Sequence, residues 1–110
     1  YGIIVGNLIN GSNDTYRVID MLEKPDIENS PSNMAIVGRY ILTPDIFDIL
    51  KNTKPDNSGE IQITDALASQ ARKGNVVAFK FKGKRFDCGS IEGYLDATNH
   101  YARSLGIKNI

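Results

Sequence analysis

The first 24 residues, YGIIVGNLINGSNDTYRVIDMLEK (1–24), decide the fold of this chain. Two apolar runs at 1–9 and 15–23 flank the segment NGSND at 10–14. Gly, Asn and Asp favour turns, whereas Ile, Val and Tyr favour strands. The pattern therefore predicts a β-hairpin whose connection is longer than the tight two-residue type.

Beyond the hairpin, apolar periodicity and turn residues predict further strands and helices in alternation. The expected elements are a strand at 33–42, a helix that Thr43 caps and that ends near residue 52, a helix from Thr64 to Gly74, a strand at 76–81 and a helix from about Ser90 to Gly106. Such alternation is typical of an α/β layer rather than a sandwich or a bundle.

Two of these elements carry a prediction about their faces. In the strand at 76–81, bulky apolar residues alternate with other residues. Val77, Phe79 and Phe81 are therefore expected on one buried face. The last helix repeats apolar residues at three- and four-residue spacing, which predicts one apolar stripe along it.

Composition narrows the function classes. The 110 residues contain 13 Lys plus Arg and 13 Asp plus Glu, so there is no net charge to attract nucleic acid or an anionic membrane. No apolar run approaches the roughly 20 residues that span a bilayer. One Cys and one His exclude an internal disulfide and the usual zinc sites, and we expect a cytoplasmic protein. Because the chain opens on an apolar run without Met, we expect residues to precede Tyr1 in a longer protein.

The segment EKP at 23–25 is the first candidate site. A carboxylate can accept hydrogen bonds from sugar hydroxyls, and a neighbouring ammonium can meet a phosphate. Adjacent strand residues point to opposite faces, so Glu23 and Lys24 can serve one ligand only if the strand bends or ends there. Pro25 favours such an end, although a charged pair before proline is also common at a solvated strand terminus.

The segment FDCGS at 86–90 is the second candidate. Asp87 is expected between a strand and the start of the last helix, where α/β sheets tend to bind phosphates and their metal. Mg²⁺ needs few protein ligands because it keeps several waters. The alternative is a turn aspartate that only accepts backbone hydrogen bonds. Cys88 is expected to be a small buried residue rather than a nucleophile.

Two further segments favour structural roles. In GEIQITD at 59–65, Thr64 and Asp65 are explained as the cap and first turn of a helix. The lysines of KFKGKR at 80–85 are typical of an edge or solvated strand face.

In this order, YG at 1–2, EKP at 23–25, PSNMAIVGRYIL at 31–42, EIQITDAL at 60–67 and KGKRFDCG at 82–89 resemble bacterial UTP–glucose-1-phosphate uridylyltransferases. The resemblance covers nearly the whole chain. It implies the C-terminal part of a Rossmann-like nucleotidyltransferase mixed sheet with flanking helices. Residues 1–110 would be its sugar-phosphate-binding part, without the upstream part that binds the nucleotide.

The resemblance also implies roles for individual residues. Gly2 and Glu23 would bind sugar hydroxyls, Lys24 would hold the phosphate of glucose 1-phosphate and act in catalysis, and Asp87 would be a ligand of the catalytic Mg²⁺. Ile36 and Tyr40 would line the sugar pocket. The sequence DCG at 87–89, where thymidylyl relatives have DTG, favours the uridylyl branch.

The implied reaction joins UTP and glucose 1-phosphate to give UDP-glucose and pyrophosphate, and the chain alone is expected to be inactive. Two alternatives stay open: a sugar-phosphate-binding or oligomerisation module without chemistry, and thymidylyl or guanylyl transfer. A homo-oligomer is expected because a partial α/β sheet exposes an edge strand and apolar faces.

Overall fold

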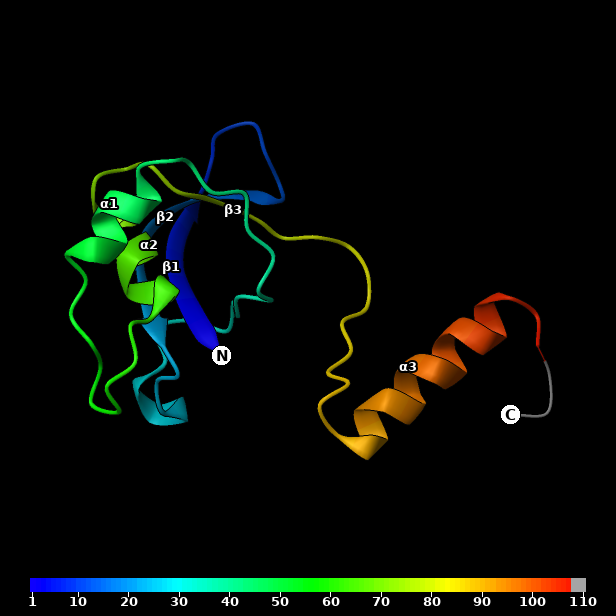
Figure 1. Ribbon diagram of the computed structural model, residues 1–110. Coiled ribbons are helices and arrows are strands. Elements are labelled where there is room, and N and C mark those ends of the chain that lie inside the picture. Colours follow the sequence, from blue (N-terminus) through cyan, green and yellow to red (C-terminus); the bar gives the residue numbers. More distant parts are fainter. Residues whose placement is uncertain (108–110) are drawn as a thin grey trace.

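The computed structural model describes residues 1–107 (Figure 1). Its centre is a three-stranded antiparallel sheet in the order β1 (Gly2–Leu8), β2 (Thr15–Glu23) and β3 (Val77–Phe79). The predicted hairpin is confirmed, with β1 and β2 joined by a loop in which Ser12 and Asp14 hydrogen-bond each other. The α/β class is confirmed as well, although within residues 1–107 the strands pair only in antiparallel fashion.

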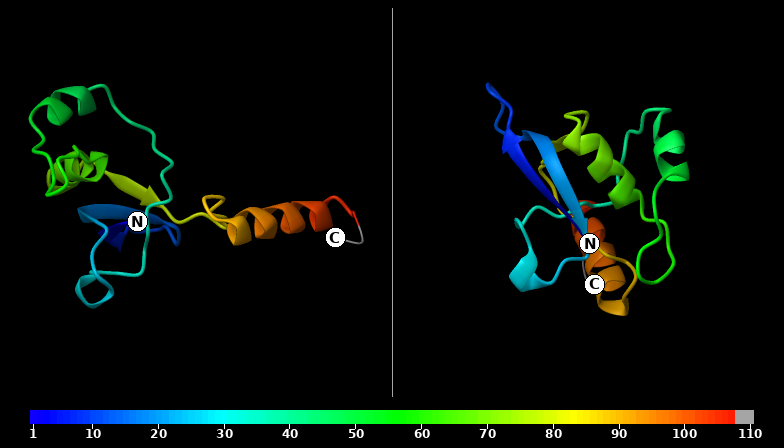
Figure 2. Two further views of the ribbon diagram at one scale, coloured as in Figure 1. Left: turned by 60° about the horizontal axis from the view of Figure 1, so that its bottom comes forward. Right: turned by 90° about the vertical axis from the view of Figure 1, so that its left-hand side faces the viewer.

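Two helices cover one face of this sheet (Figure 2). Helix α2 (Ile63–Arg72) packs on β2, and the shorter α1 (Ile46–Lys51) packs on α2. The alanines of α2 let its backbone approach the sheet closely, since a methyl group fills little space. The buried core consists of Ile4, Val18, Met21, Ile46, Ala66, Leu67, Ala68 and Ala71. Both helices agree with the predicted ones, apart from their N-caps.

The N-caps differ from the predictions. Helix α1 begins after Asp45, and the Thr43 hydroxyl donates to the Asp45 carboxylate instead of capping the helix. Helix α2 begins after Gln62, so Thr64 lies inside the first turn. Its hydroxyl donates to Oε2 of Glu23.

A β-bulge sets which side chains of β2 face the helices. The register pairs Val5 with Asp20 but Gly6 with Val18, so Ile19 is an extra residue on β2. Strand residues alternate between faces, and one extra residue reverses that alternation. Val18 before the bulge and Met21 after it therefore both enter the core.

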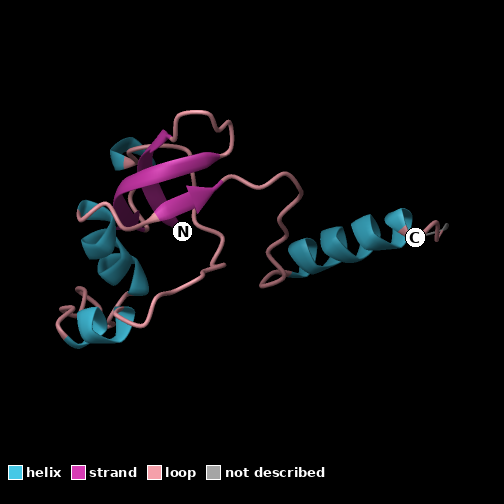
Figure 3. Ribbon diagram, turned by 90° about the horizontal axis from the view of Figure 1, so that it is seen from above, coloured by secondary structure: helices cyan, strands magenta, loops and turns pink. Residues whose placement is uncertain are grey.

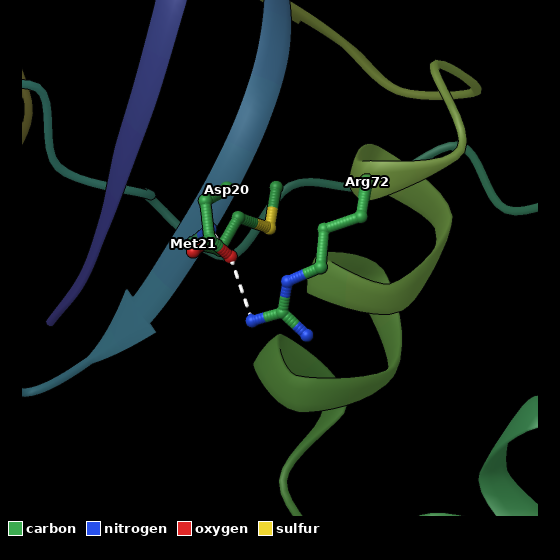
Figure 4. A network of polar contacts seen from close by, with 3 residues as sticks. All are labelled: Asp20, Met21 and Arg72. Carbon is green, nitrogen blue, oxygen red and sulfur yellow. Dashed lines mark hydrogen bonds and ion pairs between the residues drawn. The ribbon is translucent and has the colours of Figure 1, made fainter.

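Arg72 ties the end of α2 to β2 at the surface (Figure 4). Its Nη2 donates to Oδ1 of Asp20 at 2.9 Å, and the backbone N–H of Met21 donates to the same oxygen at 2.9 Å. The Arg72 side chain is 61% exposed, so the ion pair itself contributes at most about 1 kcal/mol. Packing of the alanine face is the main attachment of α2.

The predicted strand at 33–42 is wrong for most of its length. Only residues 34–36 follow the edge of β1, where the Ile4 amide donates to Met34 O at 3.0 Å and the Ile36 amide donates to Gly2 O at 2.8 Å. Gly38 then adopts a φ of 76°, which turns the chain away from the sheet. A 3₁₀ turn, η1 (Ile27–Asn29), precedes this segment.

The predicted faces of β3 are also wrong. Val77 is 60% exposed, Phe79 is 66% exposed and Phe81 is 43% exposed, whereas the smaller Ala78 packs against the core. The register explains this result, because Ala78 pairs with Tyr16, which lies on the same face as Val18. The bulky side chains therefore occupy the face opposite α2, which no helix among residues 1–107 covers (Figure 3).

Helix α3 (Ile91–Ser104) is confirmed but stands apart from the sheet (Figures 1 and 3). Ser90 caps it by accepting from the Gly93 amide at 3.0 Å, and Gly106 follows its end with a φ of 78°. None of its side chains is buried, so its apolar stripe is exposed. Within residues 1–107 no helix combines the length and apolar character that crossing a bilayer requires.

Candidate functional site

Glu23 lies at the end of β2, where four groups converge. Its partner in the register is Gly2, and Oε2 of Glu23 accepts a hydrogen bond from the Thr64 hydroxyl. A Cβ atom on Gly2 would lie 2.7 Å from Cδ1 of Ile36 and 3.3 Å from both Oε2 of Glu23 and Oγ1 of Thr64. Glycine at position 2 therefore allows these side chains to pack closely, and a Cβ there would displace the end of the Ile36 side chain.

The strand ends between Glu23 and Lys24, which is the condition for both side chains to serve one ligand. Strand β2 ends at Glu23, and Lys24 adopts a φ of 45°, in the left-handed region. Its amide donates to Tyr1 O at 2.9 Å, which holds this turn. Because the alternation of side chains stops where the strand ends, Lys24 does not have to point to the face opposite Glu23. Both residues border one hollow beside the N-terminal end of α2.

Ile36 and Tyr40 come from the loop that follows the edge of β1. Ile36 is held by its hydrogen bond to Gly2 O and packs beside Gly2. Partial burial and the negative charge of Glu23 raise the pKa of the Tyr40 hydroxyl, so Tyr40 lies within electrostatic reach of that carboxylate. Gly2, Ile36 and Tyr40 thus lie near Glu23, but they do not line the hollow that Glu23 and Lys24 border.

Asp87 is exposed and held in a network of its own. Oδ1 accepts from the Gly89 amide at 2.9 Å, and Oδ2 accepts from the Tyr1 hydroxyl at 2.9 Å. Arg85 donates to the same hydroxyl at 2.9 Å and lies 4.3 Å from the centroid of the Tyr1 ring. The Gly89 amide first, then the Tyr1 hydroxyl and the Arg85 charge, lower the pKa of Asp87. The carboxylate is therefore ionised at neutral pH.

Tyr1 connects the two parts of the site. Its carbonyl accepts from the amide of Lys24, and its hydroxyl donates to Asp87. Asp87 is not among the residues that line the hollow beside Glu23 and Lys24. Tyr1 therefore links the turn at Lys24 to Asp87, although Asp87 does not share the hollow that Glu23 and Lys24 border.

Asp87 suits one role in a magnesium site. Mg²⁺ prefers hard oxygen ligands and keeps several waters, so a single ionised carboxylate is a suitable ligand beside phosphate oxygens. Among residues 1–107 no three His, Cys, Asp or Glu side chains gather into a metal cage. The donor set fits a metal that Asp87 shares with ligands from elsewhere.

Sequence reasoning missed one member of the site and misplaced another residue. Thr64 was expected to cap α2, but its hydroxyl instead reaches Glu23, 41 positions away. The available signal is its place on the stripe of Leu67, Ala68 and Ala71, at helical spacing, where a polar residue needs a partner. Cys88 was expected to be buried and is exposed.

A carboxylate and an ammonium group at one strand end, connected through Tyr1 to an exposed aspartate, are compatible with transfer between phosphates. The sequence profile of the nucleotidyl transferase family matches residues 1–104. The chain therefore belongs to the nucleotidyl transferase family.

The resemblance to bacterial UTP–glucose-1-phosphate uridylyltransferases is confirmed by proteins of that name. The chain is 63% identical to one from Pseudomonas aeruginosa over 105 residues, which cover 96% of the chain and 37% of that protein. It is 41% identical to one from Streptococcus pyogenes over 104 residues, which cover 93% of the chain and 33% of that protein. The chain thus spans only about a third of the length of these relatives.

Solved structures give the same result. A UDP-glucose pyrophosphorylase in complex with UDP-glucose is 54% identical, with a TM-score of 0.85 over 94% of this chain and 39% of that one. A UTP-bound enzyme of the same kind from Acinetobacter baumannii is 36% identical, with a TM-score of 0.73 over 94% of this chain and 35% of that one.

Proposed function

We propose that the chain is the sugar-phosphate-binding part of an enzyme that transfers a uridylyl group from UTP to glucose 1-phosphate. The products are UDP-glucose and pyrophosphate. The observation that carries the proposal is the strand end, where Glu23 is held by Thr64 and Lys24 turns out of the strand. The relative solved with UDP-glucose, 54% identical to this chain, supports the choice of ligand.

The reaction needs charge control more than proton transfer. A phosphate oxygen of glucose 1-phosphate attacks the α-phosphorus of UTP, one P–O bond forms, and the bond to the β-phosphate breaks to release pyrophosphate. The nucleophile is already an anion, so no general base is required. The protein has to bring two anions together and to stabilise charge that spreads over the phosphates.

The residues divide this task. Glu23 accepts hydrogen bonds from sugar hydroxyls, Gly2 and Ile36 shape the space beside it, and Tyr40 closes the sugar side. Lys24 neutralises the phosphate of the sugar. Asp87 would hold Mg²⁺, which when bound supplies positive charge for the transferring phosphates.

Assembly and compartment belong to the same proposal. We propose a homo-oligomer, which is supported by the exposed apolar side chains of α3 and of β3. A cytoplasmic location is supported by the single cysteine, Cys88, which is exposed and forms no disulfide within the chain.

The test uses the full-length protein that contains these residues and measures pyrophosphate release from UTP and glucose 1-phosphate. We expect Lys24→Asn to lower kcat/KM by roughly 100-fold or more, because the variant lacks the ammonium group that stabilises negative charge on the phosphates. Asn tolerates the left-handed backbone, so its stability should match that of the parent, and Lys24→Arg should retain part of the activity.

Other outcomes separate the alternatives. Near-normal turnover in both Lys24→Asn and Asp87→Ala would show that the segment is a module without chemistry. A preference for TTP or GTP over UTP in a substrate panel would place the protein in another branch of the family. Turnover by residues 1–110 alone would contradict the assignment of a partial site.

A further inference from the structure

Thr64 is one of two buried polar residues among residues 1–107, with 2% of its surface exposed. The other, Gln70, donates to Asp45 at 3.1 Å and holds α1 against α2. Thr64 has no such structural partner on the helices. Its hydroxyl, which has one proton to donate, is directed at Oε2 of Glu23.

The sheet and the helix both lead to this contact. The bulge at Ile19 places Glu23 on the same face of β2 as Met21, which is the face that α2 covers. Thr64 lies one and two turns before Leu67, Ala68 and Ala71 on the buried stripe of α2, so the helix presents its hydroxyl to the end of β2. The hydrogen bond therefore forms without any distortion of β2 or α2 at these two residues.

A single hydrogen bond to one carboxylate oxygen has a directional consequence. Oε2 of Glu23 is engaged by Thr64 on one side, while Gly2 leaves open the space that a side chain would fill. The remaining lone pairs of Glu23, chiefly those of Oε1, then point in a fixed direction. A carboxylate held in this way accepts hydrogen bonds only from hydroxyls at matching positions.

We propose that Thr64 is a positioning residue that orients Glu23 and so determines which hexose 1-phosphate the site accepts. This inference rests on the proposed function of Glu23 as the ligand of the sugar. Thr64 does not touch the sugar in this arrangement. It acts on sugar selection, and it leaves the binding of UTP unaffected.

The main test compares glucose 1-phosphate with galactose 1-phosphate, which differs only in the direction of one hydroxyl. Thr64→Val replaces the hydroxyl with a methyl group of similar size. In the full-length protein we expect KM for glucose 1-phosphate to rise roughly 10- to 100-fold, because a misplaced Glu23 no longer meets the sugar hydroxyls in the right direction. The preference for glucose over galactose 1-phosphate should fall, and KM for UTP should stay within about twofold of the parent value.

Matched variants separate positioning from simple packing. Thr64→Ser keeps the hydroxyl and removes the methyl group, so it should retain the sugar preference even if it lowers stability. In a Glu23→Gln background, Thr64→Val should add little, because the two residues act through one bond. A purely structural role predicts the reverse, with Thr64→Ser as harmful as Thr64→Val and with the KM values of both substrates affected alike.

Two results would overturn the inference while leaving the proposed function intact. One is an unchanged glucose preference in Thr64→Val, and the other is additive effects of Thr64→Val and Glu23→Gln. Should Thr64→Val fail to fold, Thr64→Ala makes the same test, since it also removes the hydroxyl and adds no volume. If the parent protein uses neither UTP nor glucose 1-phosphate, the proposed function itself fails, and so does the inference that depends on it.

Discussion

At the scale of single residues, Lys24 occupies a backbone conformation that most side chains avoid. Among residues 1–107 it is the only residue other than glycine with a positive φ, of 45°. This conformation costs an L-residue about 1–2 kcal/mol. The amide of Lys24 donates to Tyr1 O and so holds this turn, which lets the ammonium group and the carboxylate of Glu23 border one hollow.

A side chain at position 2 is expected to disturb the packing around Glu23. In Gly2→Ala the new methyl group would lie 2.7 Å from Cδ1 of Ile36, so Ile36 or the strand has to move. We expect a loss of about 1–3 kcal/mol in the free energy of unfolding, as for other overpacked positions, together with a raised KM for glucose 1-phosphate. Urea unfolding and steady-state kinetics measure the two effects.

Gly11→Ala is the control for this change. Gly11 has a φ of 85°, which favours glycine, but a Cβ there would meet nothing within 4 Å. Its substitution should cost about 1 kcal/mol of stability and leave both KM values unchanged. Equal effects of the two alanines on KM would contradict the role of Gly2 in the site.

At the scale of elements, the sequence predicted features that depend on neighbouring residues better than features that depend on contacts between distant segments. The hairpin, α2 and α3 were predicted because their turn residues and periodicity lie within the element itself. The prediction of a strand at 33–42 was wrong because the pairing with β1 stops at Ile36 and Gly38 turns the chain away. The predicted faces of β3 were wrong because the register with β2 decides them. The same limit applies to the site. Glu23 and Lys24 are neighbours in sequence, whereas the contact of Glu23 with Thr64 spans 41 positions.

The loop before α2 is expected to contribute to the acid sensitivity of the fold. Hydrogen bonds from the Ser58 hydroxyl, then from Gln62 and from the Glu60 amide, lower the pKa of Asp56 far below its usual range. A carboxyl group with a depressed folded-state pKa stabilises the fold above its unfolded-state pKa of about 3.9, and this contribution is lost as pH falls through the folded-state value.

Asp56→Asn tests this loop. We expect the variant to be less stable than the parent at pH 7 and to lose less stability than the parent between pH 5 and pH 2. Urea unfolding across this range measures both slopes, with Asp96→Asn on the exposed side of α3 as the control. Parallel curves for the parent and Asp56→Asn would rule out the role given to Asp56.

At the scale of the whole molecule, residues 1–107 are more extended than one compact domain. The radius of gyration is 16.9 Å, compared with about 13 Å for a compact domain of 100 residues. Helix α3 accounts for the difference, since it stands away from the sheet with Ile91 77% exposed and Leu95 51% exposed. Apolar side chains displayed in this way are typical of surfaces that another chain or segment covers.

The proposed homo-oligomer can be tested by the mass of the protein in solution. The full-length protein should show a mass above that of the monomer in light scattering. Leu95→Asp should lower the measured mass, because it places a charge on the apolar stripe of α3. Asp96→Lys, a charge change at the neighbouring position, serves as the control. A monodisperse monomer for the parent protein at crystallisation concentration would contradict the proposal.

The extra residue at Ile19 makes the binding chemistry depend on chain length as well as on residue type. Glu23 lies five positions after Val18, so strict alternation without the extra residue would place the acid on the face opposite Val18, toward the uncovered face of the sheet. Every residue of the proposed site would still be present in such a plain ladder, but the acid would point away from α2. The spacing of this strand is therefore itself part of the proposed recognition.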